Sequence, residues 1–112
     1  MNRYEGFRVG ILEQARTAAE ANHYITKTTW GLANEYGIPE SHVREELLGL
    51  AEFGLIALSA WDGERDRPLN EWADPDSLFS NTTGIGHVHI WLLSPGGELL
   101  SKTAKSRIGF TA

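Results

Sequence analysis

Between residues 28 and 58 the apolar positions recur at helical spacing and then run together, which predicts two helices and a following strand. Val43, Leu47 and Leu50 are four and three residues apart, so they fall on one face of a helix expected over 40–53. This helix is the most clearly patterned element of the chain. Its polar residues would face solvent or a ligand.

A shorter helix is expected before it, over residues 29–36, with Thr28 or Thr29 as its N-cap. Gly37 would end this helix, and Pro39 suits the first position of the next one. Two helices joined by so tight a turn form a helix-turn-helix. The residues expected to be buried from the first helix and the turn are Trp30 or Leu32, together with Ala33, Tyr36 and Ile38.

Two strands are predicted in the second half of the chain. Gly54 would close the long helix, a mostly apolar strand would run over 55–61, and the Asp62-Gly63 pair would form a turn. Residues 87–93 alternate cleanly between apolar and polar positions and form the partner strand. Val88, Ile90 and Leu92 would face one side of it, and His87, His89, Trp91 and Leu93 the other.

The segment between these strands, residues 61–87, is predicted to be irregular and is unusually long for a hairpin. Loops of this length in small domains are usually functional or partly ordered insertions. A short helical turn is expected around 75–79. Four apolar side chains, which indicate that part of the segment folds back onto the body, are Leu69, Trp72, Leu78 and Phe79.

At the N-terminal end, residues 5–22 predict a helix whose apolar stripe would pack under the other two. The stripe consists of Phe7, Ile11, Ala15 and Ala18. The helix could also extend a dimer interface, so a homodimer remains open. Residues 23–27 are expected to be a short connection.

After Pro95 two interpretations stay open, a last helix or a hairpin through Pro95 to Gly97. Residues 101–112 form a polar tail in which Ile108 and Phe110 are the apolar anchors.

Composition limits the classes that need to be considered. A chain of 112 residues with 41% hydrophobic and 22% charged residues is expected to be one soluble domain. The absence of Cys excludes disulfides and thiol chemistry. No apolar run approaches the ~18 residues of a membrane span, and no secretory signal is present, so a cytoplasmic location is expected.

The spacing of the central residues resembles that of winged-helix regulators of the MarR and PadR kind. The resemblance is carried by Leu32-Ala33, Gly37-Ile38, Val43, Leu47, Leu50 and Gly54-Leu55-Ile56. It implies an α+β, winged helix-turn-helix fold over residues 1–112, with a three-helix core, a two- or three-stranded wing sheet and a C-terminal helix. In this fold residues 61–87 would be an extended wing.

The resemblance also implies a transcriptional regulator that binds double-stranded DNA, with the 40–53 helix in the major groove. Arg44 could read guanine, while residues at the start of the preceding helix would lie near phosphates. The residues expected to contact DNA are Lys27, Thr28, Thr29, Ser41, His42, Arg44 and Glu45.

Charge argues for an alternative. The chain has a net charge of −5, whereas nucleic-acid binders usually carry a basic face. The 40–53 helix has four carboxylates against Arg44, and the 61–87 segment has six against two arginines. The basic residues gather in the tail, at Lys102, Lys105 and Arg107. The alternative is a winged helix that contacts a protein partner, or serves as an accessory subunit, and does not bind DNA.

Other chemistry has weaker support. His87 and His89 project from one strand face and could hold a metal with a third ligand, although an ordinary sheet face is the simpler interpretation. Trp61, Trp72 and Trp91 could form a binding patch or core packing. No phosphate-binding loop, metalloprotease pair or nucleophile elbow is present, so neither an enzyme nor a cofactor or metal is expected.

Overall fold

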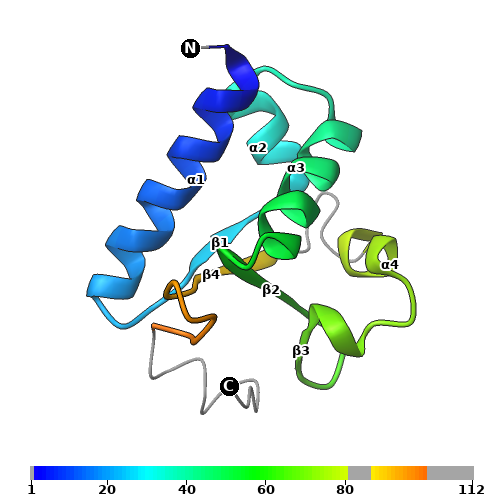
Figure 1. Ribbon diagram of the computed structural model, residues 1–112. Helices are drawn as coiled ribbons and strands as arrows, with labels where there is room; N and C mark the ends of the chain where they lie inside the picture. Colours follow the sequence, from blue (N-terminus) through cyan, green and yellow to red (C-terminus); the bar gives the residue numbers. More distant parts are fainter. Residues whose placement is uncertain (1, 81–86, 101–112) are drawn as a thin grey trace.

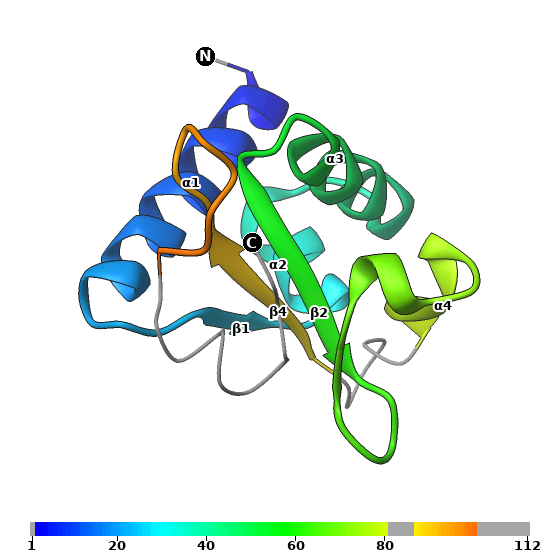
Figure 2. The ribbon, with the colours of Figure 1, turned by 60° about the horizontal axis from the view of Figure 1, so that its bottom comes forward.

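The computed structural model describes residues 2–80 and 87–100, which form an α+β fold, as predicted (Figure 1). In this part of the chain four α-helices accompany an antiparallel sheet with the strand order β1-β4-β2-β3. Figure 2 shows β1, β4 and β2 side by side.

Helix α1 (Arg3–Glu20) begins and ends slightly earlier than the range 5–22 expected for it. Asn2 caps it, since its side chain accepts a hydrogen bond from the Glu5 N–H at 2.9 Å. The apolar stripe faces the core as predicted, with Ala18 half-buried at its end. The fully buried residues of the stripe are Phe7, Ile11 and Ala15.

Helix α2 (Thr29–Tyr36) has the bounds that were predicted. Thr28 is its N-cap, because its side chain accepts a hydrogen bond from a backbone N–H three residues later at 2.8 Å. Gly37 ends the helix with a φ of 66°, in the left-handed region that favours glycine. Leu32 is fully buried whereas Trp30 is 62% exposed, so Leu32 is the residue that enters the core.

Helix α3 (Glu40–Glu52) confirms the clearest of the sequence predictions. The helix stops one residue before the expected end, and Gly54 follows with a φ of 77°. Its buried residues are Val43, Leu47 and Leu50, and Ile38 of the preceding turn is buried with them.

The connection predicted for residues 23–27 is wrong in part, because Ile25–Lys27 form strand β1. In antiparallel register Ile25 lies opposite Ile90, and Lys27 lies opposite Val88. Three residues are too few to show an alternating pattern, and their partner strand lies far along the chain. The pairing that creates β1 is therefore invisible to a local reading of the sequence.

Strands β2 (Ile56–Trp61) and β4 (Val88–Leu92) are antiparallel neighbours at the centre of the sheet. Their side chains alternate as predicted, with Val88 and Ile90 in the main core beneath the helices. Trp91 points to the other face, where it forms a small cluster with Ala57 and Leu99.

The segment between β2 and β4 is more ordered than predicted. It contains strand β3 (Asp66–Pro68), a 3₁₀ helix η1 (Leu69–Glu71) and helix α4 (Pro75–Ser80), and residues 81–86 lie outside the described part. The expected helical turn is confirmed, whereas β3 replaces what was predicted to be irregular chain. Leu78 and Phe79 are fully buried, and Leu69 and Trp72 pack against the same core, so the segment does fold back.

After β4 the chain makes a hairpin-like turn. Leu93 and Leu99 form an antiparallel bridge, and the Ser94 N–H donates a hydrogen bond to the Glu98 carbonyl at 2.8 Å. The hairpin alternative is thus confirmed as far as Leu100. A last helix starting directly after Pro95 is wrong as far as Leu100, because residues 95–100 form a turn and a bridge, and the polar tail, residues 101–112, lies outside the described part.

None of the helices in the described part is long and apolar enough to cross a membrane.

Candidate interaction surface

The outer face of α3 carries the residues predicted to read bases. Ser41 and Glu45 are exposed on it, and Arg44 is half-buried and makes no ion pair with any described residue. Glu52 is exposed on the same side of the helix. The solvent-facing stripe of α3 therefore presents two uncompensated carboxylates and one arginine.

His42 is held against α1 rather than presented to solvent. Its Nδ1 lies 2.6 Å from the hydroxyl of Tyr4, with which it shares a hydrogen bond, and the two rings lie 5.7 Å apart. A base contact through Nδ1 of His42 would have to break this hydrogen bond, so Nε2 is the ring nitrogen that could contact a base without this loss.

The residues predicted to lie near phosphates have structural roles at the start of α2. Lys27 Nζ lies 3.4 Å from a carboxylate oxygen of Glu35, and Thr28 is the N-cap. Thr29 is only 1% exposed, and its hydroxyl donates a hydrogen bond to Glu40 at 3.3 Å. Because Thr29 is buried, its side chain cannot contact a ligand at the surface.

Net charge is unevenly divided along the chain. All fifteen Asp and Glu residues but only seven of the ten Lys and Arg residues lie in the described part, which leaves it a net charge of −8. Within that part four of the seven cations are already ion-paired. The remaining three basic residues, in the tail, carry +3.

The acidic segment after β2 neutralises several of its own carboxylates. Asp62 accepts hydrogen bonds from the N–H groups of Arg65 and Glu64, and these lower the pKa of its carboxyl. Arg67 Nη2 lies 2.7 Å from the other oxygen of Asp62. Arg65 pairs with Glu71. Both arginines of the segment are therefore used in local ion pairs, whereas Glu64, Asp74 and Asp76 make no ion pair with a described residue.

The predicted histidine pair separates into two environments. His87 is exposed, whereas His89 lies 3.0 Å from Asp66, a side chain that is only 4% exposed. Among the described residues no three His, Asp or Glu side chains are grouped so that they could hold a metal ion. One oxygen of Asp66 is buried without a hydrogen-bond partner.

The three tryptophans also lie in different environments. Trp91 is fully buried, and its indole N–H donates a hydrogen bond to Ser59 at 2.9 Å. Trp72 is half-buried and donates to the Arg67 carbonyl at 2.9 Å. Trp61 is 54% exposed at the end of β2.

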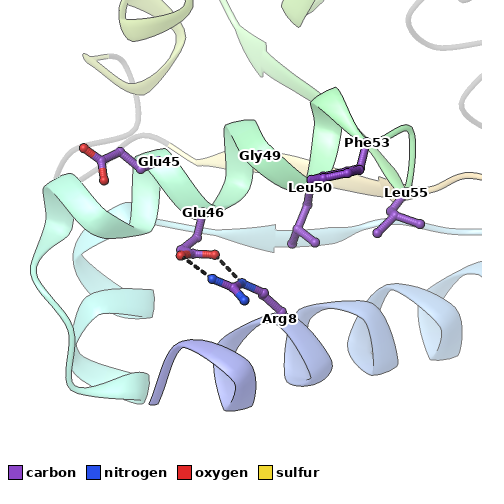
Figure 3. A pocket seen from close by; sticks show the side chains of 7 residues that line it. All are labelled: Arg8, Glu45, Glu46, Gly49, Leu50, Phe53 and Leu55. Atoms are coloured by element: carbon purple, nitrogen blue, oxygen red, sulfur yellow. Dashed lines mark hydrogen bonds and ion pairs between the residues drawn. The ribbon is translucent and has the colours of Figure 1, made fainter. Parts of the chain in front are cut away.

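A groove between α1 and α3 lies next to the predicted site (Figure 3). Its volume is about 580 Å³, and it is lined by Arg8, Glu45, Glu46, Gly49, Leu50, Phe53 and Leu55. Phe53 is 85% exposed and Leu55 is 42% exposed, so two large apolar side chains face solvent at the end of α3. Isolated exposed apolar residues are ordinary, whereas apolar residues grouped beside a groove make it a candidate contact surface.

Arg8 and Glu46 tie the two walls of the groove together. The guanidinium donates to both carboxylate oxygens, at 2.6 and 2.9 Å, and Figure 3 shows the two side chains meeting from opposite helices. These hydrogen bonds lower the pKa of Glu46 and raise that of Arg8. A bidentate pair of this kind fixes the orientation of both partners.

A second groove of about 340 Å³ continues along α1 and shares Leu55 with the first. Its lining residues are Val9, Leu12, Glu13, Arg16, Leu55, Leu92 and Leu93. Val9 is itself 42% exposed. The two grooves together form one apolar surface, which we call the α1–α3 groove.

One residue, Phe53, could have indicated this surface from the sequence. Phe53 lies off the stripe formed by Val43, Leu47 and Leu50, and comes between Glu52 and Gly54 where the helix has ended. A large apolar side chain at such a position cannot join the buried face of the helix that precedes it.

Comparison with known proteins adds no relative: no family model, no curated protein and no solved structure matches the chain.

Proposed function

We propose that this chain is a winged-helix module that binds another polypeptide through the α1–α3 groove. The observation that carries the proposal is the exposure of Phe53 and Leu55 at the rim of an apolar groove. Aromatic side chains that fill a partner's pocket are typical anchors of protein interfaces.

The order of the elements supports a winged helix. Three helices precede β2, the second and third are joined by a tight turn at Gly37, and β2 and β4 are antiparallel neighbours. Strand β1, which lies between the first two helices in the sequence, pairs with β4, so that β1, β4 and β2 form three neighbouring strands of the sheet. The insertion of β3, η1 and α4 then extends the wing.

Two features favour a protein over DNA as the ligand. The described part carries a net charge of −8, and phosphate contacts require cations that the exposed face of α3 supplies only at Arg44. Helix α4, which contains Asp76 and directly follows Asp74, also packs against α3 (Figure 2). Like charges would repel a duplex that approached α3.

The test is a capture experiment in which the bound protein is identified and then rebuilt from purified components. Full-length protein is immobilised, exposed to an extract of its source cells, and its bound proteins are identified by mass spectrometry. Phe53→Ser and Leu55→Ser should each abolish retention of the partner. Trp61→Ser, which removes another exposed aromatic side chain at the far end of β2, should not. A partner retained equally by all four proteins would overturn the proposal.

DNA binding is the second candidate, favoured by the same element order and by the position of Ser41 and Arg44 in the first turns of α3. In this case Arg44→Ala should weaken specific binding, and Glu45→Lys should strengthen non-specific binding. Selection from a random DNA library at low salt tests it. Failure to enrich any sequence would exclude DNA as the ligand of the intact chain.

A further inference from the structure

Four side chains on the outer side of α1 form a stripe whose two halves complement each other. They follow one another at spacings of four, three and four residues, which places them on one side of a helix. In chain order they are acidic, apolar, apolar and basic: Glu5, Val9, Leu12 and Arg16. We call these four residues the α1 stripe. Because their spacing is the same in both directions, the stripe can face an inverted copy of itself.

The α1 stripe faces away from the core of its own molecule. Figure 1 shows α1 along one edge of the molecule, and the buried residues of this helix are Phe7, Ile11 and Ala15. Leu12 is half-buried, and the other three residues of the stripe are exposed. Glu5 accepts a hydrogen bond from the side chain of Asn2 at 3.2 Å, but neither Glu5 nor Arg16 makes an ion pair with a described residue. Both charges are therefore open to another molecule.

The apolar centre of the stripe belongs to a wider apolar surface. Val9 and Leu12 lie in the second half of the α1–α3 groove, and the other apolar residues that line this half are Leu55, Leu92 and Leu93. Its two charged lining residues, Glu13 and Arg16, are one acid and one base. This half of the groove therefore lacks the excess of negative charge that the described part has as a whole, and apolar burial there favours association.

We propose that two copies of this chain associate through the α1 stripe, with their α1 helices antiparallel and the two-fold axis passing between residues 10 and 11. In this register Val9 of each copy lies opposite Leu12 of the other, and Glu5 lies opposite Arg16. Each pair occurs twice, as an isologous interface requires. The inference goes beyond the proposed function, because it assigns the side of the groove along α1 to a second copy and leaves the side at Phe53 to a different polypeptide.

Charge selects the antiparallel orientation of the two helices. If they ran in the same direction, Glu5 would face Glu5 and Arg16 would face Arg16. Positions 5 and 16 are about 16 Å apart along the helix at 1.5 Å per residue, so the antiparallel interface has one attractive pair on each side of its apolar centre. Exposed ion pairs add little affinity. Apolar burial therefore holds the copies together, and the charges set their orientation.

Sedimentation velocity of the purified full-length chain tests whether it self-associates through α1. Over a concentration series the wild type should pass from the mass of one chain, 12.4 kDa, to twice that mass. Val9→Glu, which places a carboxylate in the apolar centre of the interface, should stay monomeric at concentrations where the wild type is dimeric. Phe53→Ser, on the other side of the groove, should dimerise as the wild type does. A wild type that stays monomeric up to about 1 mM would overturn the proposal.

A charge exchange tests the register. Arg16→Glu places a carboxylate opposite Glu5 at both ends of the interface, and Glu5→Arg places two cations opposite each other in the same way. Each single change should weaken dimerisation about tenfold, because two attractive pairs become repulsive. The double variant, Glu5→Arg with Arg16→Glu, restores both pairs in exchanged order and should dimerise nearly as well as the wild type. Glu64→Arg, at an exposed position beyond β2, changes the net charge as Glu5→Arg does and should not weaken dimerisation.

Two results of the charge exchange would overturn the proposal. Dimers that are indifferent to both single reversals use a different interface, and a double variant no stronger than the single variants means that the helices do not meet in this register. Far-ultraviolet circular dichroism should show the helix content of the wild type in every variant, because the substituted side chains are exposed.

Failure of this inference can be told apart from failure of the proposed function. The sedimentation experiments contain only the purified chain, whereas capture through Phe53 is measured in an extract. Mass spectrometry identifies a captured second copy as the chain itself and separates it from the other polypeptide. If Val9→Glu dimerises like the wild type, the α1 stripe is not the interface between copies, whatever the capture experiment shows. If Phe53→Ser leaves capture unchanged, the proposed function fails and the dimer stands.

Discussion

Gly10→Ala tests how closely α1 is held against α2, and thereby the spacing that brings Arg8 to Glu46 across the groove. A Cβ on Gly10 would collide with the hydroxyl oxygen of Tyr36. That hydroxyl accepts a hydrogen bond from Gln14 at 2.9 Å. The Tyr36 ring also meets Phe7 edge-on, with centroids 5.1 Å apart.

Two opposing contributions decide whether Gly10→Ala raises or lowers the free energy of unfolding. Replacing Gly with Ala inside a helix stabilises it by about 1 kcal/mol. To make room, Tyr36 must move, which loses a hydrogen bond of about 1 kcal/mol and an aromatic contact of about 1 kcal/mol. Pushing the side chain off its rotamer costs about 1 kcal/mol more. The clash outweighs the gain, and Gly10→Ala should lower the free energy of unfolding by about 2 kcal/mol.

Urea unfolding followed by circular dichroism measures this difference. Gly49→Ala in α3 is the matched control, because a Cβ there meets nothing within 4 Å, and it should raise the free energy of unfolding by about 1 kcal/mol. Tyr36→Phe removes the colliding atom, so the cost of Gly10→Ala should shrink in that background. If Gly10→Ala stabilises the protein as Gly49→Ala does, the Tyr36 hydroxyl does not lie as close to Gly10 as the structure places it.

Two further predictions concern the insertion and the groove. Phe79→Ala should lower the free energy of unfolding by about 3–5 kcal/mol, because Phe79 is 1% exposed in the main core; a change below 1 kcal/mol in urea unfolding would mean that α4 does not pack there. Arg8→Ala should destabilise the protein at neutral pH and not in acid. The Arg8 hydrogen bonds hold the pKa of Glu46 below its ordinary value of 4.5, so their contribution is present above that value and is lost as pH falls through the lowered pKa. A difference between wild type and Arg8→Ala in thermal melts that persists unchanged at low pH would contradict this.

The helices could be predicted because their determinants are local. The apolar spacing of Val43, Leu47 and Leu50 and the glycine at position 37 specify α2, α3 and the turn without reference to the rest of the chain. Strands β1 and β3 could not be predicted from the sequence, because each has only three residues and is defined by its pairing with another strand. Their partners in β4 and β2 supply the hydrogen bonds that define them.

The groove that we propose as the binding surface includes part of α3, the helix on which the sequence predicted DNA contacts, but it lies at a different position. Sequence patterns place Ser41 and Glu45 outward, as the structure does, yet they give no distance between α1 and α3. The groove depends on that distance and on the meeting of Arg8 with Glu46, two residues 38 positions apart. His42 shows the same limitation, because its hydrogen bond to Tyr4 arises from helix packing.

Salt dependence distinguishes the two candidate functions, because their driving forces differ. DNA binding would have to use cations outside the ion pairs, which in the described part are Arg3, Arg16 and Arg44. The logarithm of a DNA-binding constant falls with the logarithm of salt concentration by about 0.9 per neutralised phosphate, so three contacts lose roughly 40-fold in affinity between 50 and 200 mM salt. Binding of a polypeptide through Phe53 and Leu55 depends on apolar burial, which such salt changes scarcely affect.

Isothermal titration of the purified partner at 50 and 200 mM salt should therefore show an affinity that stays nearly constant. An affinity that falls steeply over this range would mean that opposite charges, and not Phe53 and Leu55, hold the partner, and the groove would lose its role as the binding surface.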